Sequence, residues 1–246
     1  MFQAFKYIVQ GLFKKFNLQI NYINDGRPRY IKAVESLGIN LVLDIGANSG
    51  QFASSLLSNG FKGRIVSFEP TSSAYNLLKK NSEGFRNWII HERAAVGDEC
   101  GRAKINIAGN EAASSSILEM GHIHKQNAPS SIYIGSEETK LITLDSIFDN
   151  YFAIDDKCLL KIDVQGYEDK VLGGALRTLQ RVSAVKLECS TVSLYHGDKT
   201  YEYYFSYFEE LGYKLFDIEA GFSNPQTGQL LQFDAFFIRP KNVRQV

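Results

Sequence analysis

The sequence predicts an α/β domain built on a parallel β-sheet. From residue 41 onward, short apolar runs alternate with segments in which apolar residues recur at the helical period, a pattern typical of repeated β-α units. The chain has 246 residues, of which 44% are hydrophobic and 22% charged, so it can bury one sizeable core and is too apolar to be disordered. We therefore expect one domain of this class.

The apolar runs and helical periods predict the elements in order. Strands are expected over residues 41–45, 64–68, 88–94, 159–163, 184–188, 214–218 and 233–238. Helices are expected over residues 51–57, 73–81, 167–179 and 201–211. Two further strands, 104–107 and 139–144, bracket residues 109–136, which are rich in Gly, Ser, Ala and Asn. This segment is predicted to be a long loop, and it is either a substrate lid or disordered.

Residues 1–40 are predicted to form a helical extension that precedes a catalytic domain over residues 41–240. Within residues 1–34, six lysines and arginines face one aspartate, which gives a net charge of +5 in a chain whose total charge is zero. Apolar residues between Phe2 and Phe16 recur every three or four positions, as in an amphipathic helix. Such a basic helix can dock on its own domain, join a homodimer or lie on an anionic membrane surface.

Composition argues against several partners and sites. A total charge of zero disfavours nucleic acid as a partner. No apolar stretch is long enough to cross a bilayer and no secretory signal is visible, so we expect a cytoplasmic protein, either free or peripheral at a membrane surface. The three cysteines lack C-x-x-C spacing, and His122 and His124 have no further ligand nearby, so neither a disulfide framework nor a metal site is predicted.

The first strand leads into a glycine-rich turn that opens a helix. Gly46 and Gly50 lack the Cβ atom that would block a close approach by a ligand. The carboxylate of Asp44 at the strand end would repel a pyrophosphate, whereas it suits a ligand with ammonium and sulfonium groups. The turn also lacks the G-x-G-x-x-G spacing of dinucleotide sites. This counts against the main alternative, a nucleotide-dependent oxidoreductase that uses NAD.

A second carboxylate, Glu69, lies at the end of the next strand, 25 residues after Asp44. That spacing fits one β-α-β unit, in which an acid at this position can accept hydrogen bonds from a ribose diol. Either acid alone is more simply a helix cap or a solvated loop residue. Because they lie at successive strand ends with glycines between them, they favour a nucleoside-containing ligand.

The ordered motifs resemble the FkbM family of S-adenosylmethionine-dependent methyltransferases. They occupy residues 44–50, 68–70, 94–97, 114–116, 143–146 and 160–168, the last reading Leu-Lys-Ile-Asp-Val-Gln-Gly-Tyr-Glu. The resemblance covers residues 41–239. It implies a Rossmann-like, doubly wound, mostly parallel seven-stranded sheet with one antiparallel edge strand. It also implies S-adenosyl-L-methionine as cofactor and O-methylation of sugar or polyketide hydroxyls.

The resemblance also assigns cofactor-binding residues. It implies that the methionine part of the cofactor is surrounded by Asp44, Gly46, Asn48 and Gly50. It places Glu69 at the ribose and Ala95 near the adenine, with Ser115 or Ser116 closing over the cofactor.

A hydroxyl acceptor also needs a general base. The candidates near strand ends are Asp163, Glu188 and His196, of which Asp163 is favoured because it lies beside the switch point of the sheet. Asp163 could instead only bind the cofactor. Lys161 lies two residues earlier on the same strand face and could lower the pKa of Asp163 or orient the substrate.

The sequence therefore predicts an O-methyltransferase acting on a hydroxyl-bearing small molecule, most simply a saccharide, a glycolipid or a glycosylated metabolite. Besides the oxidoreductase, one alternative stays open. The chain could be a methyltransferase-fold interaction module that meets a membrane through residues 1–34.

Overall fold

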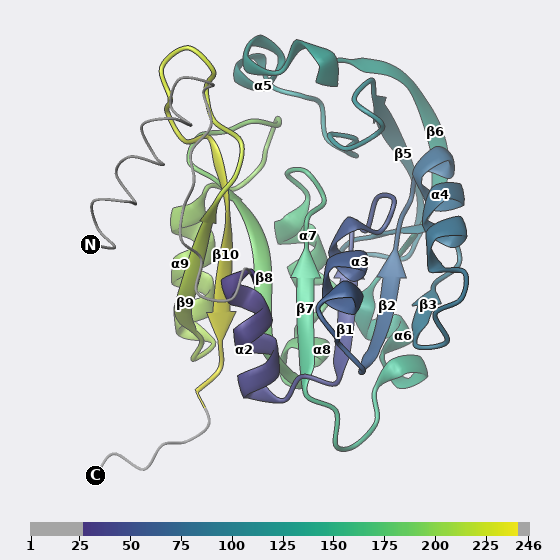
Figure 1. Ribbon diagram of the computed structural model, residues 1–246. Helices are drawn as coiled ribbons and strands as arrows, with labels where there is room; N and C mark the ends of the chain where they lie inside the picture. Colours follow the sequence, from purple (N-terminus) through teal and green to yellow (C-terminus); the bar gives the residue numbers. More distant parts are fainter. Residues whose placement is uncertain (1–26, 241–246) are drawn as a thin grey trace, which may run out of the picture.

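The computed structural model describes residues 27–240 and shows a seven-stranded sheet with helices on both faces (Figure 1). The strand order is β3-β2-β1-β7-β8-β10-β9. The strands are β1 (Leu41–Ile45), β2 (Arg64–Phe68), β3 (Trp88–Ile90), β7 (Cys158–Ile162), β8 (Val182–Ser190), β9 (Lys214–Ala220) and β10 (Gln232–Ile238). β10 lies next to the edge strand β9 and runs antiparallel to both of its neighbours, β8 and β9, in an otherwise parallel sheet. The predicted fold class is confirmed.

Side chains alternate between the two faces of each strand, so each face has its own apolar cluster. One cluster packs under α2 (Arg29–Leu37), α3 (Gln51–Ser58) and α4 (Ser72–Ser82). The other packs under α6 (Leu144–Tyr151), α7 (Glu168–Gly173), α8 (Leu176–Leu179) and α9 (Tyr201–Glu210). On β1, Val42 faces the first cluster while Leu41 and Leu43 face the second. Asp44 therefore points toward the side of α2, α3 and α4.

A second sheet of three strands, in the order β4-β6-β5, stands beside the main one. It consists of β4 (Ala94–Val96), β5 (Gly101–Ala108) and β6 (Tyr133–Ile142). The strand expected over residues 88–94 is thus divided between the two sheets. His91 leaves the main sheet between the two parts, where its ring packs on Phe68 and its Nδ1 lies 2.7 Å from the Tyr151 hydroxyl.

The segment over residues 109–136 is less irregular than expected. It contains the short helix α5 (His122–Asn127), a 3₁₀ turn (Pro129–Ser131) and the start of β6. Figure 1 shows this part of the chain above the carboxyl ends of the parallel strands. The predicted helix over residues 167–179 is divided into α7 and α8 at Gly173 and Gly174. A Cβ on Gly174 would lie 2.0 Å from the carbonyl oxygen of Gly97, so only glycine allows this close crossing.

The first described helix, α2, belongs to the packed domain. Its residues Tyr30, Ile31, Ala33 and Val34 are buried in the apolar cluster on its face of the sheet. The amphipathic pattern predicted between Phe2 and Phe16 lies outside the described residues. No helix in the described part of the chain has both the length and the apolar character needed to cross a bilayer.

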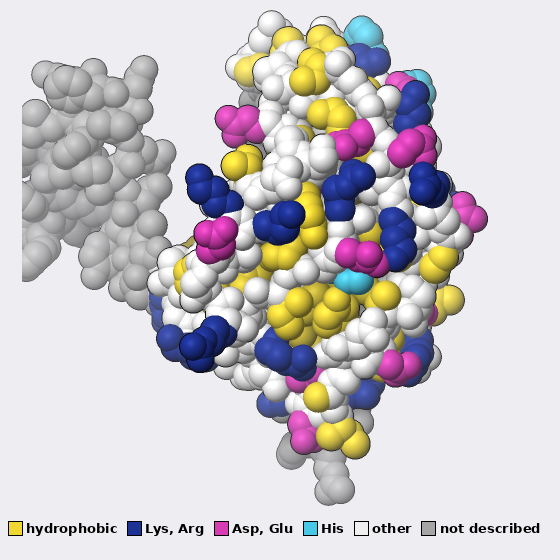
Figure 2. All heavy atoms as spheres, turned by 90° about the vertical axis from the view of Figure 1, so that its right-hand side faces the viewer, with side chains coloured by type: hydrophobic (Ala, Val, Ile, Leu, Met, Phe, Trp, Pro, Cys, Tyr) yellow, Lys and Arg dark blue, Asp and Glu magenta, His cyan; other side chains and the backbone are white. Residues whose placement is uncertain are grey.

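Charged side chains of both signs are interspersed on the face shown in Figure 2. Among the described residues several exposed charges are paired, for example Arg177 with Asp149 at 2.6 Å and Lys214 with Glu209 at 3.2 Å. Exposed pairs of this kind contribute little to stability because solvent screens them and side-chain entropy opposes them. The described fold therefore depends mainly on the apolar clusters that cover the two faces of the sheet.

The turn after β7 is closed by Glu168, the first residue of α7. Its Oε1 accepts the backbone N–H groups of Val164 at 3.1 Å and Gly166 at 3.2 Å. The side chain is buried, and burial raises its pKa from 4.5 to about 7. The carboxyl group of Glu168 thus holds its proton more tightly in the folded protein than in the unfolded chain. The contribution of Glu168 to stability is therefore complete at low pH and decreases as the pH rises from 4.5 to about 7.

We predict that Glu168→Gln removes this loss, because the amide stays neutral and keeps an oxygen that can accept both N–H groups. Urea unfolding between pH 4 and 8 measures the result. The free energy of unfolding of the variant, relative to the wild type, should rise by up to about 3 kcal/mol between the two pKa values and stay level above them. The same change at the exposed Glu210 is the control. A pH-independent difference would contradict the argument.

Candidate active site

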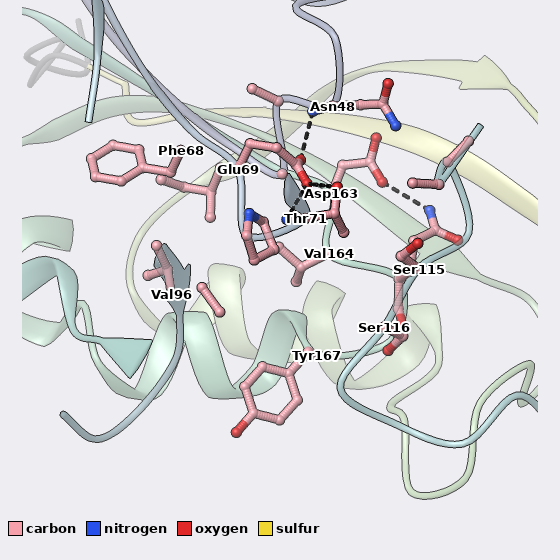
Figure 3. A pocket seen from close by; sticks show the side chains of 18 of the residues that line it. Asn48, Phe68, Glu69, Thr71, Val96, Ser115, Ser116, Asp163, Val164 and Tyr167 are labelled. Carbon is pink, nitrogen blue, oxygen red and sulfur yellow. Dashed lines mark hydrogen bonds between the residues drawn. The ribbon is translucent and has the colours of Figure 1, made fainter. Parts of the chain in front are cut away.

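A cavity of about 340 Å³ opens where the carboxyl ends of β1, β2 and β7 meet. Its wall is formed by residues 45–48, 68–71, 94–96, 112–113, 115–117 and 163–165, together with Gln51, Phe52, Ile105, Lys161, Tyr167, Lys186 and Asp234. Figure 3 shows side chains from these separate segments pointing toward one space. Its size falls within the range of small-molecule sites.

The glycine-rich turn brings the exits of β1 and β7 into contact. Gly46 has φ +75°, and a Cβ there would lie 1.8 Å from the backbone oxygen of Asp163. Gly46 and Asn48 line the cavity, whereas Gly50 does not. Gly50 has φ +93° at the start of α3, and a Cβ there would meet the Trp88 ring at 2.5 Å. Gly50 therefore packs the turn against β3 and makes no part of the cavity wall.

Glu69 lines the cavity at the end of β2 and is held in a fixed orientation. Its Oε2 accepts the backbone N–H of Asn48 at 2.9 Å. Its Oε1 accepts the backbone N–H of Thr71 at 2.8 Å and the Thr71 hydroxyl at 2.6 Å (Figure 3). Burial raises the pKa of Glu69, and these three hydrogen bonds oppose that rise. Since a carboxylate oxygen can accept two hydrogen bonds, Oε2 keeps an acceptor position for a ligand hydroxyl.

Asp44, which the family resemblance places at the methionine part of the cofactor, is fully buried at the end of β1. Its side chain is 0% exposed and does not line the cavity, whereas that of Lys161 does. Its Oδ2 accepts the Ser67 hydroxyl at 3.2 Å, and its Oδ1 lies 3.4 Å from Lys161 Nζ without any hydrogen bond. Burial raises the pKa of Asp44, while the charge of Lys161 lowers it. Asp44 therefore meets the cavity wall through its ion pair with Lys161.

Lys161 links the two acids on this face of the sheet. Its Nζ donates to the carbonyl of Gly46 at 2.9 Å and lies 3.4 Å from both Asp44 Oδ1 and Asp163 Oδ2. Burial lowers the pKa of Lys161, but Asp163 and Asp44 outweigh that effect and raise it overall. The ammonium group stays charged beside Asp163.

Asp163 lines the cavity, and its side chain is 34% exposed. Its Oδ1 accepts a hydrogen bond of 2.9 Å from the Gln165 amide, which also donates to Glu188 at 2.6 Å. Glu188 lies behind Gln165 and outside the cavity wall. Burial raises the pKa of Glu188 well above its usual value, and the charges of Asp163 and Glu168 add to the rise.

The predicted cofactor residues Ala95, Ser115 and Ser116 all line the cavity. Ser115 Oγ accepts the backbone N–H of Ala108 at 3.0 Å, whereas Ser116 Oγ donates to the backbone carbonyl of Gln165 at 2.7 Å. The serine run thus connects the segment above the sheet to the turn after β7. We call residues 108–118 the cover segment.

The histidines lie away from the cavity wall. His196, a candidate base, is exposed, and its backbone N–H bonds to Glu119. His122 is exposed on α5, whereas His124 is buried against Tyr195 and Phe222. Burial lowers the pKa of His124 to about 4. Within residues 27–240, no three His, Cys, Asp or Glu side chains are grouped so that they could hold a metal ion.

The structure also brings in residues that the sequence argument missed. Gln165 and Tyr195 support Asp163, and Thr71 supports Glu69. Gln165 belongs to the 160–168 motif, but nothing in the sequence indicates which side chains its amide contacts. Lys186 and Asp234 line the far end of the cavity and form an ion pair there, with Glu219 also 3.1 Å from Lys186 Nζ. Lys186 lies on β8 and Asp234 on β10. These two strands are distant in sequence but are antiparallel neighbours in the sheet.

The wall fits S-adenosylmethionine. Glu69 offers an oriented carboxylate for ribose hydroxyls, and the apolar side chains of Phe68, Ala95 and Val96 offer a surface for an adenine ring. The carboxylate of Asp163 suits the positive charge of a sulfonium or an ammonium group. The left-handed backbone at Gly46 and Asn48 leaves the main chain accessible beside these groups.

Solved methyltransferase structures resemble this chain at low identity. One is magnesium protoporphyrin IX methyltransferase from Synechocystis PCC 6803 (9% identity, 86% of this chain and 75% of that chain, TM-score 0.46). A second is TrmK from M. capricolum (11%, 87% and 69%, TM-score 0.48). A third is precorrin-6y C5,15-methyltransferase from Geobacter metallireducens GS-15 (12%, 85% and 86%, TM-score 0.43).

No curated protein matches the sequence. A family model described as the methyltransferase FkbM domain matches residues 44–215, which is most of the chain. The matched region begins at Asp44 on β1 and ends within β9. It contains every residue of the cavity wall except Asp234. The chain is therefore a member of the FkbM family of S-adenosylmethionine-dependent methyltransferases.

Proposed function

We propose that this protein methylates a hydroxyl group of a saccharide, a glycolipid or a glycosylated metabolite, with Asp163 as the general base. The observation that carries the proposal is the position of Asp163. It is an oriented carboxylate at the end of β7, lining the same cavity as the carboxylate of Glu69. An aligned nucleophile and a nearby proton acceptor are what a hydroxyl methylation requires of the protein.

The bound cofactor supplies a methyl group already activated on its sulfonium centre. In the proposed arrangement, Glu69 binds the ribose, Ala95 contacts the adenine, and Gly46 and Asn48 lie along the methionine part. Ser115 and Ser116 hold the cover segment over it. Asp44 acts from behind the wall by keeping Lys161 in place.

Asp163 would accept the proton of the acceptor hydroxyl. Oδ1 is held by Gln165, and Oδ2 lies 3.4 Å from Lys161 Nζ, so the carboxylate keeps one face toward the cavity. The cover segment excludes water from the reacting atoms, which limits competition with the acceptor. Glu188 and His196, the other candidates, would both need a movement to reach the cavity, since neither lines it.

The saccharide assignment is supported by the far end of the cavity. Lys186 and Asp234 offer paired donors and acceptors there, and Phe52 offers an aromatic edge of the wall. Hydroxyl groups of a neutral polyol can bond to both members of such a pair without leaving a charge unpaired.

A separate proposal concerns residues 1–34, which could serve as a contact for an anionic membrane surface or for a second subunit. Vesicle co-sedimentation of the full chain and of a chain beginning at Arg27 would test it. The shortened chain must keep α2, since its buried residues belong to the core, so the comparison tests the part of this segment before Arg27.

We predict that methyl-labelled S-adenosylmethionine will transfer label to a member of a panel of neutral glycans and glycolipids. Mass spectrometry of the product identifies the methylated oxygen. Asp163→Asn should lower turnover at least about a hundredfold because it removes the proton acceptor. Binding of S-adenosylhomocysteine should stay within a few-fold. No transfer to any hydroxyl acceptor, or an Asp163→Asn variant as active as wild type, would refute the proposal.

We predict that Glu69→Gln weakens S-adenosylhomocysteine binding by roughly tenfold or more in calorimetry. The glutamate carboxylate accepts hydrogen bonds at two oxygens, whereas the glutamine amide accepts them at one oxygen only. Glu83→Gln, an exposed change at the end of α4, is the matched control and should bind like wild type. Equal affinities for all three proteins would show that Glu69 does not contact the cofactor. Circular dichroism melting checks that the variants remain folded.

A further inference from the structure

Gln165 has a backbone conformation that is unusual for its side chain. It lies between Asp163 and Gly166 with φ +58°, in the left-handed region, and is only 8% exposed. A glycine or an asparagine would adopt this conformation with less strain. Strained residues that persist in a buried turn beside a cavity are typical of functional sites. The side chain must therefore contribute something that the more permissive residues cannot.

Every polar group of the Gln165 side chain is used. Nε2 donates to Asp163 Oδ1 at 2.9 Å and to Glu188 Oε2 at 2.6 Å. Oε1 accepts the Tyr195 hydroxyl at 2.7 Å. An amide has two N–H donors and one oxygen, so these three contacts exhaust its donors and orient its acceptor.

These partners also fix which way the amide faces. In the reverse orientation, Oε1 would lie against two carboxyl groups and Nε2 against the Tyr195 hydroxyl. Tyr195 is itself held rigidly, since its ring packs so closely on Gly166 that a Cβ there would lie 2.8 Å from Tyr195 Cβ. The ring is fully buried. Gln165 therefore has one stable side-chain position, and Asp163 is held by it.

The backbone of Gln165 has a second connection. Its carbonyl oxygen accepts the Ser116 hydroxyl at 2.7 Å, and the Tyr195 hydroxyl also lies 3.3 Å from the carbonyl oxygen of Ser114. Ser114 and Ser116 belong to the cover segment. The same residue thus contacts the floor of the cavity through its side chain and the cover through its main chain.

We propose that Gln165 is the positioning residue of the methyl transfer: its amide aims the Asp163 carboxylate into the cavity, and its carbonyl holds the cover segment above it. This inference rests on the proposed role of Asp163 as the base. The amide also separates Asp163 from Glu188, which would otherwise face each other as two acids. Burial, together with Asp163 and Glu168, raises the pKa of Glu188.

The first experiment is independent of any acceptor and uses the side-chain amide signals of the ¹⁵N-labelled full chain bound to S-adenosylhomocysteine. The pair lost in Gln165→Glu identifies Gln165. We expect both of its protons to exchange slowly with water and one of them to shift in Asp163→Asn. The amide of Gln232 is the control, since it donates to the same Glu188 oxygen at 2.9 Å. Rapidly exchanging Gln165 signals that Asp163→Asn leaves unchanged would overturn the inference.

The second experiment measures methyl transfer to the acceptor found in the glycan panel. Gln165→Glu should lower kcat roughly ten- to hundredfold at pH 8, because a carboxylate repels Asp163 instead of holding it. The loss should shrink as the pH falls, since the protonated carboxyl group can donate again. Gln232→Glu places the same charge beside Glu188 without touching Asp163, and should show no such recovery. A loss in Gln165→Glu that is the same at every pH would indicate a merely structural role.

The two proposals fail in different ways. If Asp163 is not the base, Asp163→Asn keeps its turnover whatever the amide signals show. If Asp163 is the base but Gln165 does not position it, Asp163→Asn is inactive while Gln165→Glu keeps the wild-type kcat and pH profile.

Discussion

The site depends on one buried ammonium group, that of Lys161. It lies between the carboxylates of Asp44 and Asp163 and donates to the carbonyl of Gly46. A charge buried in this way is stable only when its partners are in place, and removing one partner leaves the other uncompensated. Lys161 therefore fixes the relative positions of the two strand exits, β1 and β7, from which the cavity is built.

The buried charge accounts for the close contact at Gly46. The ends of β1 and β7 can both contact Lys161 only if their backbones nearly touch. A Cβ on Gly46 would lie 1.8 Å from the backbone oxygen of Asp163, so no side chain is tolerated at Gly46. The same face continues outward from Asp44 through Ser67, whose hydroxyl also accepts the Trp88 indole N–H at 2.9 Å. A polar row thus crosses β3, β2, β1 and β7 beneath α3 and α4. This row links the edge strand β3 to the Asp163 carboxylate through Ser67, Asp44 and Lys161.

Sequence reasoning located the strand ends well, and with them Glu69 and Asp163, because the apolar runs of parallel strands stop where the polar residues begin. The full burial of Asp44 could not be predicted, because alternation along a strand tells which face a side chain takes and not how deeply its neighbours cover it. The network around Gln165 was out of reach for another reason. Tyr195 and Glu188 lie more than twenty residues away, and only the folded chain brings them to the amide. The second sheet was likewise missed as a unit, since β4 is short and pairs with β6 more than forty residues later.

The position of the cover segment follows from the same constraints. Ser116 reaches the turn after β7 only because Gln165 takes a left-handed conformation that turns its carbonyl toward the cover. If the cover moved away, Gln165 would lose a backbone partner and Tyr195 the contact with Ser114, while the amide kept its hold on Asp163. Closing the cavity therefore costs little rearrangement at the carboxylate. In the proposed mechanism, an Asp163 carboxylate that is already oriented before the site closes needs no reorganisation during the reaction, and this is the condition under which a fixed charge contributes most to catalysis.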